Sequence, residues 1–283
     1  MKWQDYIDRY ATEIFLNFGE ESVLILKKLA EHICDAPYSS IRNAEISPED
    51  IGTANIMLEE LKKGRPLQYI LGEAWFYKYP FKVNESVLIP RPETEELIEW
   101  VLSYIKNSPL NKTAITILDI GTGSGCIPIT LKKEIPELQI TSIDVSTDAL
   151  VTAKENAVSL QTEIEFRTLD FLNESSWNDL NMYDILISNP PYIPVNEKET
   201  LSLNVREYEP HQALFTPENQ PLLFYHKIAE FGKSHLQSGG AVFLELHQNF
   251  AEKTKHLFEE KNYKNVEIKK DISGNDRMLK AFR

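Results

Sequence analysis

The residues of this chain that most directly suggest chemistry are Asn189-Pro190-Pro191-Tyr192. They follow the apolar run Ile185-Leu186-Ile187-Ser188, which predicts a buried strand that ends at Asn189. The two prolines have no backbone N–H groups and stiffen the chain, so the Asn189 amide and the neighbouring carbonyls are held in place. An amide oxygen beside a backbone carbonyl can accept both hydrogens of one NH2 group, and the Tyr192 ring could stack on the plane of that group. The motif therefore suits chemistry on a planar amino nitrogen, although alone it is equally typical of a turn that ends a strand.

A glycine-rich segment follows an earlier predicted strand. The run 115–120 has the composition of a buried strand, and Gly121-Thr122-Gly123-Ser124-Gly125 comes directly after it. Glycines allow the backbone to turn sharply and a ligand to approach it closely. The DxGxGxG spacing differs from the GxGxxG of dinucleotide-binding proteins and from the P-loop, which needs GK[ST]. Because such turns are common in α/β proteins, this one indicates a ligand site only together with other signals.

Acidic residues mark the ends of the next two predicted strands. The run 139–144 ends at Asp144, about 20 residues further on, where an acid can bind both hydroxyls of a ribose. Asp170 and Phe171 follow the third strand and could hold and cover an aromatic base that carries an exocyclic amine. Alternatively, Asp144 or Ser146 caps the next helix, and Asp170 and Phe171 form a loop end with one buried ring. Since the carboxyl ends of parallel strands meet at one crevice, the signals together favour a single site.

Predicted strands and helices alternate from residue 93 onward. The strands are expected at 115–120, 139–144, 163–167, 183–188, 240–246, 264–269 and 277–282. The helices are expected at 93–106, 124–134, 147–158, 220–236 and 249–261. This alternation predicts an α/β fold in which a mostly parallel sheet carries helices on both faces.

The N-terminal part of the chain has a different pattern. Residues 1–65 show apolar residues at helical spacing in three segments, the last of which begins after Ser47-Pro48. Short apolar runs then predict a β-hairpin with a turn near Tyr79-Pro80, and these runs are 69–72, 75–77 and 81–83. The sequence therefore predicts a helical N-terminal domain at 1–65, a β-hairpin linker at 66–92 and a larger domain at 93–283.

Composition and charge exclude several classes of function. The chain of 283 residues has no apolar stretch long enough to span a bilayer and no apolar signal core after Met1, so we expect a cytoplasmic protein. Cys34 and Cys126 lie far apart, and the six histidines are scattered, so we expect no metal site. The net charge of −13 argues against direct nucleic-acid binding, because phosphate contacts need a basic face. It is compatible with a basic protein partner or a cationic small molecule.

The order of these signals resembles the class I S-adenosylmethionine-dependent methyltransferases, whose Rossmann-like fold has a seven-stranded, mostly parallel sheet. The resemblance implies S-adenosyl-L-methionine as cofactor and S-adenosyl-L-homocysteine as product. It implies that Gly121 to Gly125, including Thr122, Gly123 and Ser124, pack against the methionine part and that Asp144 binds the ribose. It also implies that Asp170 and Phe171 hold the adenine, with Asn189 beside the cofactor. A hydride-transfer enzyme fits less well, because it leaves the Asn-Pro-Pro-Tyr motif without a role.

Further motifs narrow the resemblance to one family. The strings RPLQYILG at 65–72 and VLIPRPETE at 87–95, EPHQAL at 209–214 and GNDR at 274–277 resemble the release-factor glutamine methyltransferases, the PrmC/HemK family, over about residues 65 to 283. The family implies methylation of the side-chain nitrogen of the glutamine in the Gly-Gly-Gln motif of class I peptide chain release factors. It implies catalytic roles for Asn189, Pro190, Pro191 and Tyr192, and contact between the helical domain and the release factor.

The sequence departs from the family pattern at two points. Residues 216–222 replace a glycine-rich turn, and His247 stands where a glycine is more usual, which we interpret as structural. The segment 89–95 is expected to have a mixed role, in which it shapes the lid of the pocket and starts a helix at Pro92, although Glu93 and Glu95 could simply place negative charge in the first turn of that helix. Neither glutamate is expected to be catalytic.

The chemistry of a planar nitrogen explains the motif. Its lone pair is delocalised, as in the peptide bond, whose resonance gives a rotational barrier of ~18–20 kcal/mol. Hydrogen-bond acceptors at Asn189 Oδ1 and the Pro190 carbonyl would orient the nitrogen, and the site needs alignment and shielding more than a strong base. The alternatives are a glutamine of a ribosomal protein, adenine N6 of DNA, or a cofactor-binding protein without activity.

Overall fold

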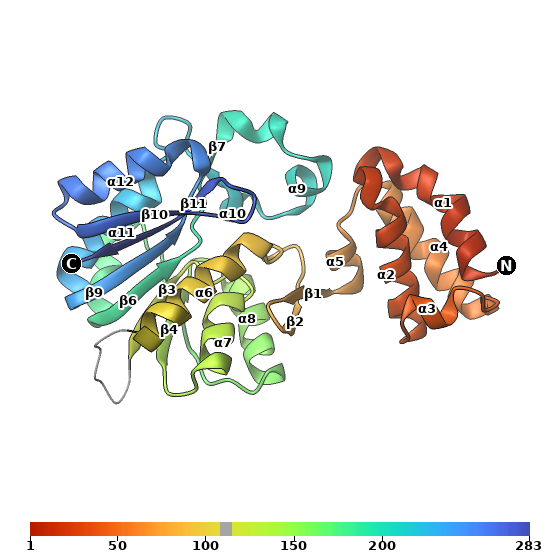
Figure 1. Ribbon diagram of the computed structural model, residues 1–283, viewed down its shortest axis with the longest axis horizontal. Coiled ribbons are helices and arrows are strands. Elements are labelled where there is room, and N and C mark those ends of the chain that lie inside the picture. Colours follow the sequence, from red (N-terminus) through yellow and green to blue (C-terminus); the bar gives the residue numbers. More distant parts are fainter. Residues whose placement is uncertain (108–114) are drawn as a thin grey trace. The chain divides into compact units, whose positions relative to one another are not determined.

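The computed structural model describes residues 1–107 and 115–283, which form two compact units (Figure 1). The first, here called the helical unit, comprises Met1–Glu73 and Glu199–Glu209. The second, here called the sheet unit, comprises Ala74–Lys198 and Pro210–Arg283. This division differs from the boundaries expected at 65 and 92, since the segment 199–209 belongs to the helical unit.

The helical unit is built from amphipathic helices around one apolar core. Ser47 caps helix α4 (Pro48–Lys62) by accepting a hydrogen bond from Asp50 N, and Pro48 begins that helix, as the sequence predicts. Its core contains Trp3, Tyr6, Ile14, Leu26, Leu29, Leu58 and Leu61. Its helices are α1 (Trp3–Phe18), α2 (Ser22–Cys34), α3 (Tyr38–Ile41), α4 (Pro48–Lys62), α5 (Leu67–Leu71) and α9 (Leu203–Tyr208), with the 3-10 turn η1 (Gly19–Glu21).

The segment 199–209 joins the helical unit through α9. The Tyr208 hydroxyl donates to the Lys63 carbonyl over 3.0 Å. The Leu203 side chain lies directly over Gly64, so close that a Cβ there would come within 3.0 Å of it. These contacts are made by residues far apart in the chain, and for that reason the sequence pattern did not predict them.

The strand expected at 69–72 is wrong, because these residues mostly belong to helix α5. Leu67, Ile70 and Leu71 share one helical face that packs on the core of the helical unit, and this tertiary packing overrides the strand preference of the aromatic and β-branched residues. Gly72 ends the helix with φ +70, a conformation that glycine adopts readily. The hairpin begins at Glu73, and its turn lies at 77–78; the turn expected near Tyr79-Pro80 is wrong, because both residues belong to strand β2.

The sheet unit contains the seven strands that the sequence predicts. They lie in the order β10-β11-β9-β6-β3-β4-β5. All neighbours pair in parallel except β11, which runs antiparallel to both β9 and β10. The strands are β3 (Thr116–Ile120), β4 (Gln139–Asp144), β5 (Glu165–Thr168), β6 (Tyr183–Ser188), β9 (Leu236–Glu245), β10 (Lys264–Lys270) and β11 (Asp276–Phe282). The predicted α/β fold with a mostly parallel sheet is confirmed.

Helices cover both faces of this sheet (Figure 1). On β6, Ile185 and Ile187 face the layer of α6, α7 and α8, whereas Leu186 faces the layer of α11 and α12. A strand buried on both faces is largely apolar, as residues 185–187 of β6 are. The helices are α6 (Pro92–Asn107), α7 (Cys126–Glu134), α8 (Thr147–Ser159), α11 (Leu223–His235) and α12 (Ala251–Glu260).

Short elements complete the sheet unit. The hairpin consists of β1 (Glu73–Phe76) and β2 (Tyr79–Lys82), whereas β7 (Ile193–Pro194) and β8 (Phe215–Thr216) pair in parallel. The remaining elements are α10 (His211–Leu214) and the 3-10 turns η2 (Glu174–Asp179) and η4 (Gln248–Phe250), while the 3-10 turn η3 (Val195–Thr200) crosses the division of the chain at residue 199. Among the helices of residues 1–107 and 115–283, none has the length and apolar character that crossing a membrane requires.

Candidate active site

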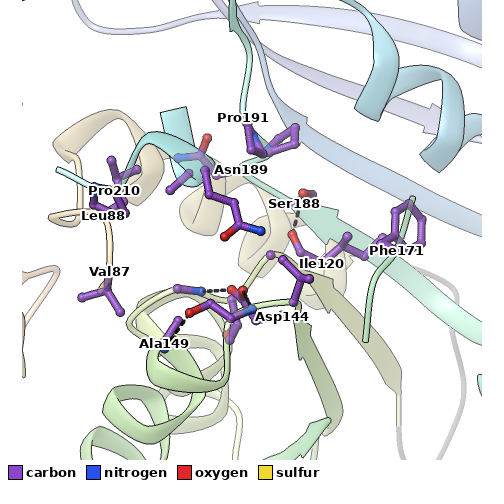
Figure 2. Close-up of a pocket in the computed structure, with 18 of the residues that line it drawn as sticks. Val87, Leu88, Ile120, Asp144, Ala149, Phe171, Ser188, Asn189, Pro191 and Pro210 are labelled. Carbon is purple, nitrogen blue, oxygen red and sulfur yellow. Dashed lines mark hydrogen bonds between the residues drawn. The ribbon is translucent and has the colours of Figure 1, made fainter. Parts of the chain in front are cut away.

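A pocket of about 550 Å³ opens at the carboxyl ends of β3, β4, β5 and β6 (Figure 2). Most of the residues expected at the site line it: Gly121, Thr122, Gly123, Ser124, Asp144, Asp170, Phe171, Asn189, Pro190 and Pro191. Gly125 and Tyr192 are not on its wall. The strand order therefore brings four separate segments of the sequence to one cavity, as the position of ligand sites in open α/β sheets predicts.

Asp144 joins the glycine-rich turn to the start of α8. Its Oδ2 accepts a hydrogen bond from Gly123 N and its Oδ1 accepts one from Ser146 N, each over 2.9 Å. Burial raises the pKa of Asp144, and these backbone donors oppose the rise. Ser146, not Asp144, caps α8 by accepting from Ala149 N. The Asp144 carboxyl is thus fixed at the pocket wall with acceptor capacity left for a diol.

Gly125 serves the packing of the turn. Its φ is +80, and a Cβ at this position would lie 2.9 Å from Ile129 Cδ1 and 3.2 Å from Ala153 Cβ. The absence of a side chain therefore lets the turn pack closely against α7 and α8. This role differs from the cofactor contact that the resemblance implies for it.

The Phe171 ring lines the pocket while being held by the core behind it. It lies edge-on to Phe231 with 5.3 Å between ring centroids, and Trp177 packs against it at 5.5 Å. Trp177 Nε1 donates to the Phe171 carbonyl over 2.9 Å. Asp170 is exposed, and its Oδ1 accepts from Leu172 N. A rigid apolar wall and an exposed carboxylate therefore stand next to each other at the end of β5.

The residues after β6 are fixed by hydrogen bonds. Ser188 Oγ donates to the Ile120 carbonyl over 2.7 Å, which ties the end of β6 to the end of β3. Asn189 Nδ2 donates to Thr94 Oγ1 over 3.0 Å. Figure 2 shows the Asn189 side chain directed into the pocket toward Asp144.

Tyr192 is placed differently from our expectation. Its hydroxyl donates to Glu245 Oε1 over 3.0 Å, and its ring lies edge-on to His247 with 5.9 Å between centroids. Because the Tyr192 ring is held on this side, away from the pocket wall, it does not offer a face for stacking in this arrangement. His247 accepts a hydrogen bond from Asn249 N at Nδ1, in accord with a structural role.

Comparison with known proteins identifies the chain's relatives. Residues 101–206 match the family model described as the methyltransferase small domain. A release factor glutamine methyltransferase of Flavobacterium psychrophilum is 49% identical over 80% of this chain and 78% of the relative. One of Thermodesulfovibrio yellowstonii is 35% identical over 99% of this chain and 97% of the relative. This chain belongs to the release factor glutamine methyltransferases. A solved structure of a human methyltransferase 10 domain containing protein is 18% identical and matches over 71% of this chain and 87% of its own length with a TM-score of 0.51, which shows the shared fold.

The segment around 89–95 was expected to shape the lid of this methyltransferase's pocket, but its lining residues were not named one by one from the sequence. Leu88, Pro90, Arg91 and Thr94 line the pocket, so part of the PRPETE region contributes to its wall. Glu93 and Glu95 do not line it, and Pro92 begins α6 as predicted. Glu95 Oε1 instead accepts a hydrogen bond from Tyr77 N over 2.8 Å, which attaches the hairpin turn to α6.

Glu245 is the other unpredicted residue. It ends the apolar strand β9 and is 1% exposed, and its carboxyl oxygens meet the hydroxyls of Thr94 and Tyr192. The sequence signal that could have revealed Glu245 was a single acid at the end of an apolar run. A carboxylate buried at such a place needs hydrogen-bond partners, which would have marked it as part of a polar cluster. In the part of the chain that the structure describes, no group of three or more His, Cys, Asp or Glu side chains is arranged to hold a metal.

Proposed function

We propose that this methyltransferase transfers the methyl group of S-adenosyl-L-methionine to the side-chain nitrogen of the glutamine in the Gly-Gly-Gln motif of class I peptide chain release factors. The observation that carries the proposal is the orientation of Asn189 at the pocket. Its Nδ2 is used by Thr94, so its Oδ1 remains as an acceptor for a substrate NH2 group. The names of the two relatives support the same substrate.

The pocket residues suit S-adenosyl-L-methionine. No described atom lies within 4 Å of where a Cβ would stand on Gly121 or Gly123, so a ligand can approach this backbone. The Thr122 and Ser124 hydroxyls are buried, and neither makes a hydrogen bond of good geometry with a residue that the structure describes. Asp119 lies near the Thr122 hydroxyl, and Cys126 lies near the Ser124 hydroxyl. Asp144 would hold the ribose, and Asp170 and Phe171 the adenine. When bound, the cofactor supplies an electrophilic methyl group on a positively charged sulfur.

The chain's own contribution is to align the nitrogen and exclude water. Asn189 Oδ1 and the Pro190 carbonyl would each accept a hydrogen bond from one N–H group of the glutamine amide. These two hydrogen bonds would fix the direction of the nitrogen lone pair. Acceptors on both hydrogens would let positive charge develop on nitrogen as the N–CH3 bond forms and the S–CH3 bond breaks, and one of the two N–H protons would then leave to solvent. The apolar wall that includes Phe171, Pro191 and Leu88 keeps water from the reacting atoms. The helical unit would contact the release factor.

The experiment offers three substrates side by side to the purified protein with S-adenosyl-L-methionine: a class I release factor, ribosomal proteins and DNA. Mass spectrometry should find one added CH2 group on the glutamine of the Gly-Gly-Gln motif. Modification of a ribosomal glutamine or of adenine instead would overturn the choice of substrate.

Asn189→Ala is the matched variant for this assay. It removes the acceptor, so turnover should fall by about 100-fold or more. Cofactor affinity, measured by calorimetry, should change by less than about threefold, because the other pocket contacts remain. Unchanged turnover would refute the assigned role of Asn189.

A further inference from the structure

Glu245 stands behind the pocket, where three elements meet. Its Oε2 accepts a hydrogen bond from Thr94 Oγ1 over 2.6 Å, and its Oε1 accepts one from the Tyr192 hydroxyl over 3.0 Å. Thr94 is on α6, Glu245 ends β9, and Tyr192 follows β6. Thr94 is 2% exposed and Glu245 is 1% exposed, so water does not substitute for these partners.

We propose that Glu245 and Thr94 are positioning residues that set which end of the Asn189 amide faces the substrate. The proposal rests on the function proposed above, because it concerns the acceptor that holds the substrate nitrogen. Neither residue contacts the reacting atoms through its carboxyl or hydroxyl. Each acts through Asn189.

The direction of the hydrogen bonds follows from the chemistry of the groups. A carboxylate can only accept, so the one hydroxyl hydrogen of Thr94 is used by Glu245. The Thr94 oxygen can then only accept from Asn189, and it selects the NH2 end of the amide. Oδ1 is left facing the pocket as an acceptor. With the opposite direction, Asn189 would present its NH2 group to the substrate NH2 group, and two donors would face each other.

A carboxylate is the side chain that can serve both hydroxyls at once. Glutamine has the same shape, but its amide has one acceptor oxygen and one donor NH2 group. It can therefore accept the hydrogen bond of only one of the two hydroxyls, Thr94 or Tyr192, and the hydrogen bond to the other hydroxyl must change direction. Burial raises the pKa of Glu245, and the hydrogen bonds from Thr94 and Tyr192 and the charge of Arg277 oppose the rise. These hydrogen bonds stabilise the doubly accepting carboxylate against the effect of burial, without reversing the upward direction of the pKa.

The test compares Thr94→Ser with Thr94→Val, and both with Glu245→Gln. Serine keeps the hydroxyl, so kcat for release-factor methylation should stay within about threefold of the wild type. Valine keeps the shape but removes the hydroxyl, and kcat should fall by about 100-fold, as expected when a reacting group is misaligned. Glu245→Gln should show a similar loss. In all three variants, KM for the release factor and calorimetric cofactor affinity should remain near wild type.

A matched control lies at the other end of the sheet. Thr116 Oγ1 donates to the buried carboxyl of Asp184 over 2.9 Å, the same kind of pair at the amino ends of β3 and β6. Thr116→Val should cost stability to a similar degree but leave kcat unchanged. The Thr94 pair decides the question even when Glu245→Gln does not fold.

Two results would overturn the inference. One is a Thr94→Val enzyme with wild-type kcat, and the other is equal impairment of the serine and valine variants. Wild-type turnover is measured first: its absence on every substrate contradicts the proposed function, whereas wild-type turnover with unaffected variants contradicts only the positioning role. When another substrate is methylated, the variants are compared on that substrate.

Discussion

Asp119, near the end of β3, carries a carboxyl group that is completely buried. Burial raises its pKa from the ordinary 3.8 to about 7, and the negative charge of Asp144 adds to the rise. The folded protein therefore holds a proton on Asp119 over a pH range in which the unfolded chain has released it. The stability that this bound proton contributes to the folded state is fully present below pH 3.8 and is lost as the pH rises through about 7.

Asp119→Asn tests this linkage. The free energy of unfolding, measured in urea from pH 3.8 to about pH 7, the window between the unfolded and folded pKa values, should fall with pH more steeply for the wild type than for the variant. Glu137→Gln, which removes one carboxylate at an exposed position, controls for the change in net charge. Identical slopes for wild type and Asp119→Asn would contradict the assignment.

Single residues show how far a sequence can predict a site. Asp144, Asp170 and Asn189 were predicted because each ends or follows a strand, and the topology of a parallel sheet brings strand ends together. Thr94 and Glu245 were not predicted, since their meeting depends on how α6 packs beside β9. Tyr192 was given a stacking role because its sequence position shows neither the direction of its ring nor the buried acid that it meets.

At the scale of elements, the turn from β3 to α7 depends on close packing at Gly125. Gly125→Ala combines a positive φ of +80 with a Cβ that would lie 2.9 Å from Ile129 Cδ1. We expect a loss of about 1–3 kcal/mol in the free energy of unfolding of the sheet unit, from backbone strain and overpacking. Cofactor affinity should fall with it, because the shifted turn carries Gly121 and Gly123.

Gly52→Ala is the matched control for this prediction. Gly52 lies inside α4, and a Cβ there would meet no atom within 4 Å other than its chain neighbours and the backbone of its own helix. The same substitution there should stabilise the helical unit by about 0.5–1 kcal/mol. Urea unfolding followed by circular dichroism measures both, and a stabilised Gly125→Ala would show that the turn is not tightly packed.

Elements were predicted best where their pattern was long and periodic. All seven strands of the sheet unit were expected, most clearly the central β6, because a parallel strand buried on both faces is largely apolar, whereas β10 is mostly exposed. The short segment 67–71 was misassigned, since five residues hold too little periodicity to separate a strand from a helix. The start of α11 was placed three residues early, at 220 rather than 223, because Pro221 is compatible with a helix start.

At the scale of the whole molecule, the two units have separate apolar cores. Leu58 belongs to the core of the helical unit and Leu186 to that of the sheet unit, and the clusters of buried residues around them share no member. Damage to one core should therefore leave the other intact. Their separation also allows substrate capture and cofactor binding to be disturbed independently, which is the expectation if the helical unit contacts the release factor.

Leu58→Ala and Leu186→Ala test this separation. Each deletes a buried side chain, so each should lower the free energy of unfolding of its own unit by about 2–5 kcal/mol. At a urea concentration above the midpoint at which the damaged helical unit unfolds, Leu58→Ala should keep wild-type cofactor affinity. It should lose efficient methylation of the intact release factor. It should still methylate a short peptide containing Gly-Gly-Gln at the wild-type rate. Leu186→Ala should weaken cofactor binding and slow both reactions, because β6 leads directly to Asn189. Loss of cofactor affinity in Leu58→Ala, measured by calorimetry, would instead mean that the two units fold as one.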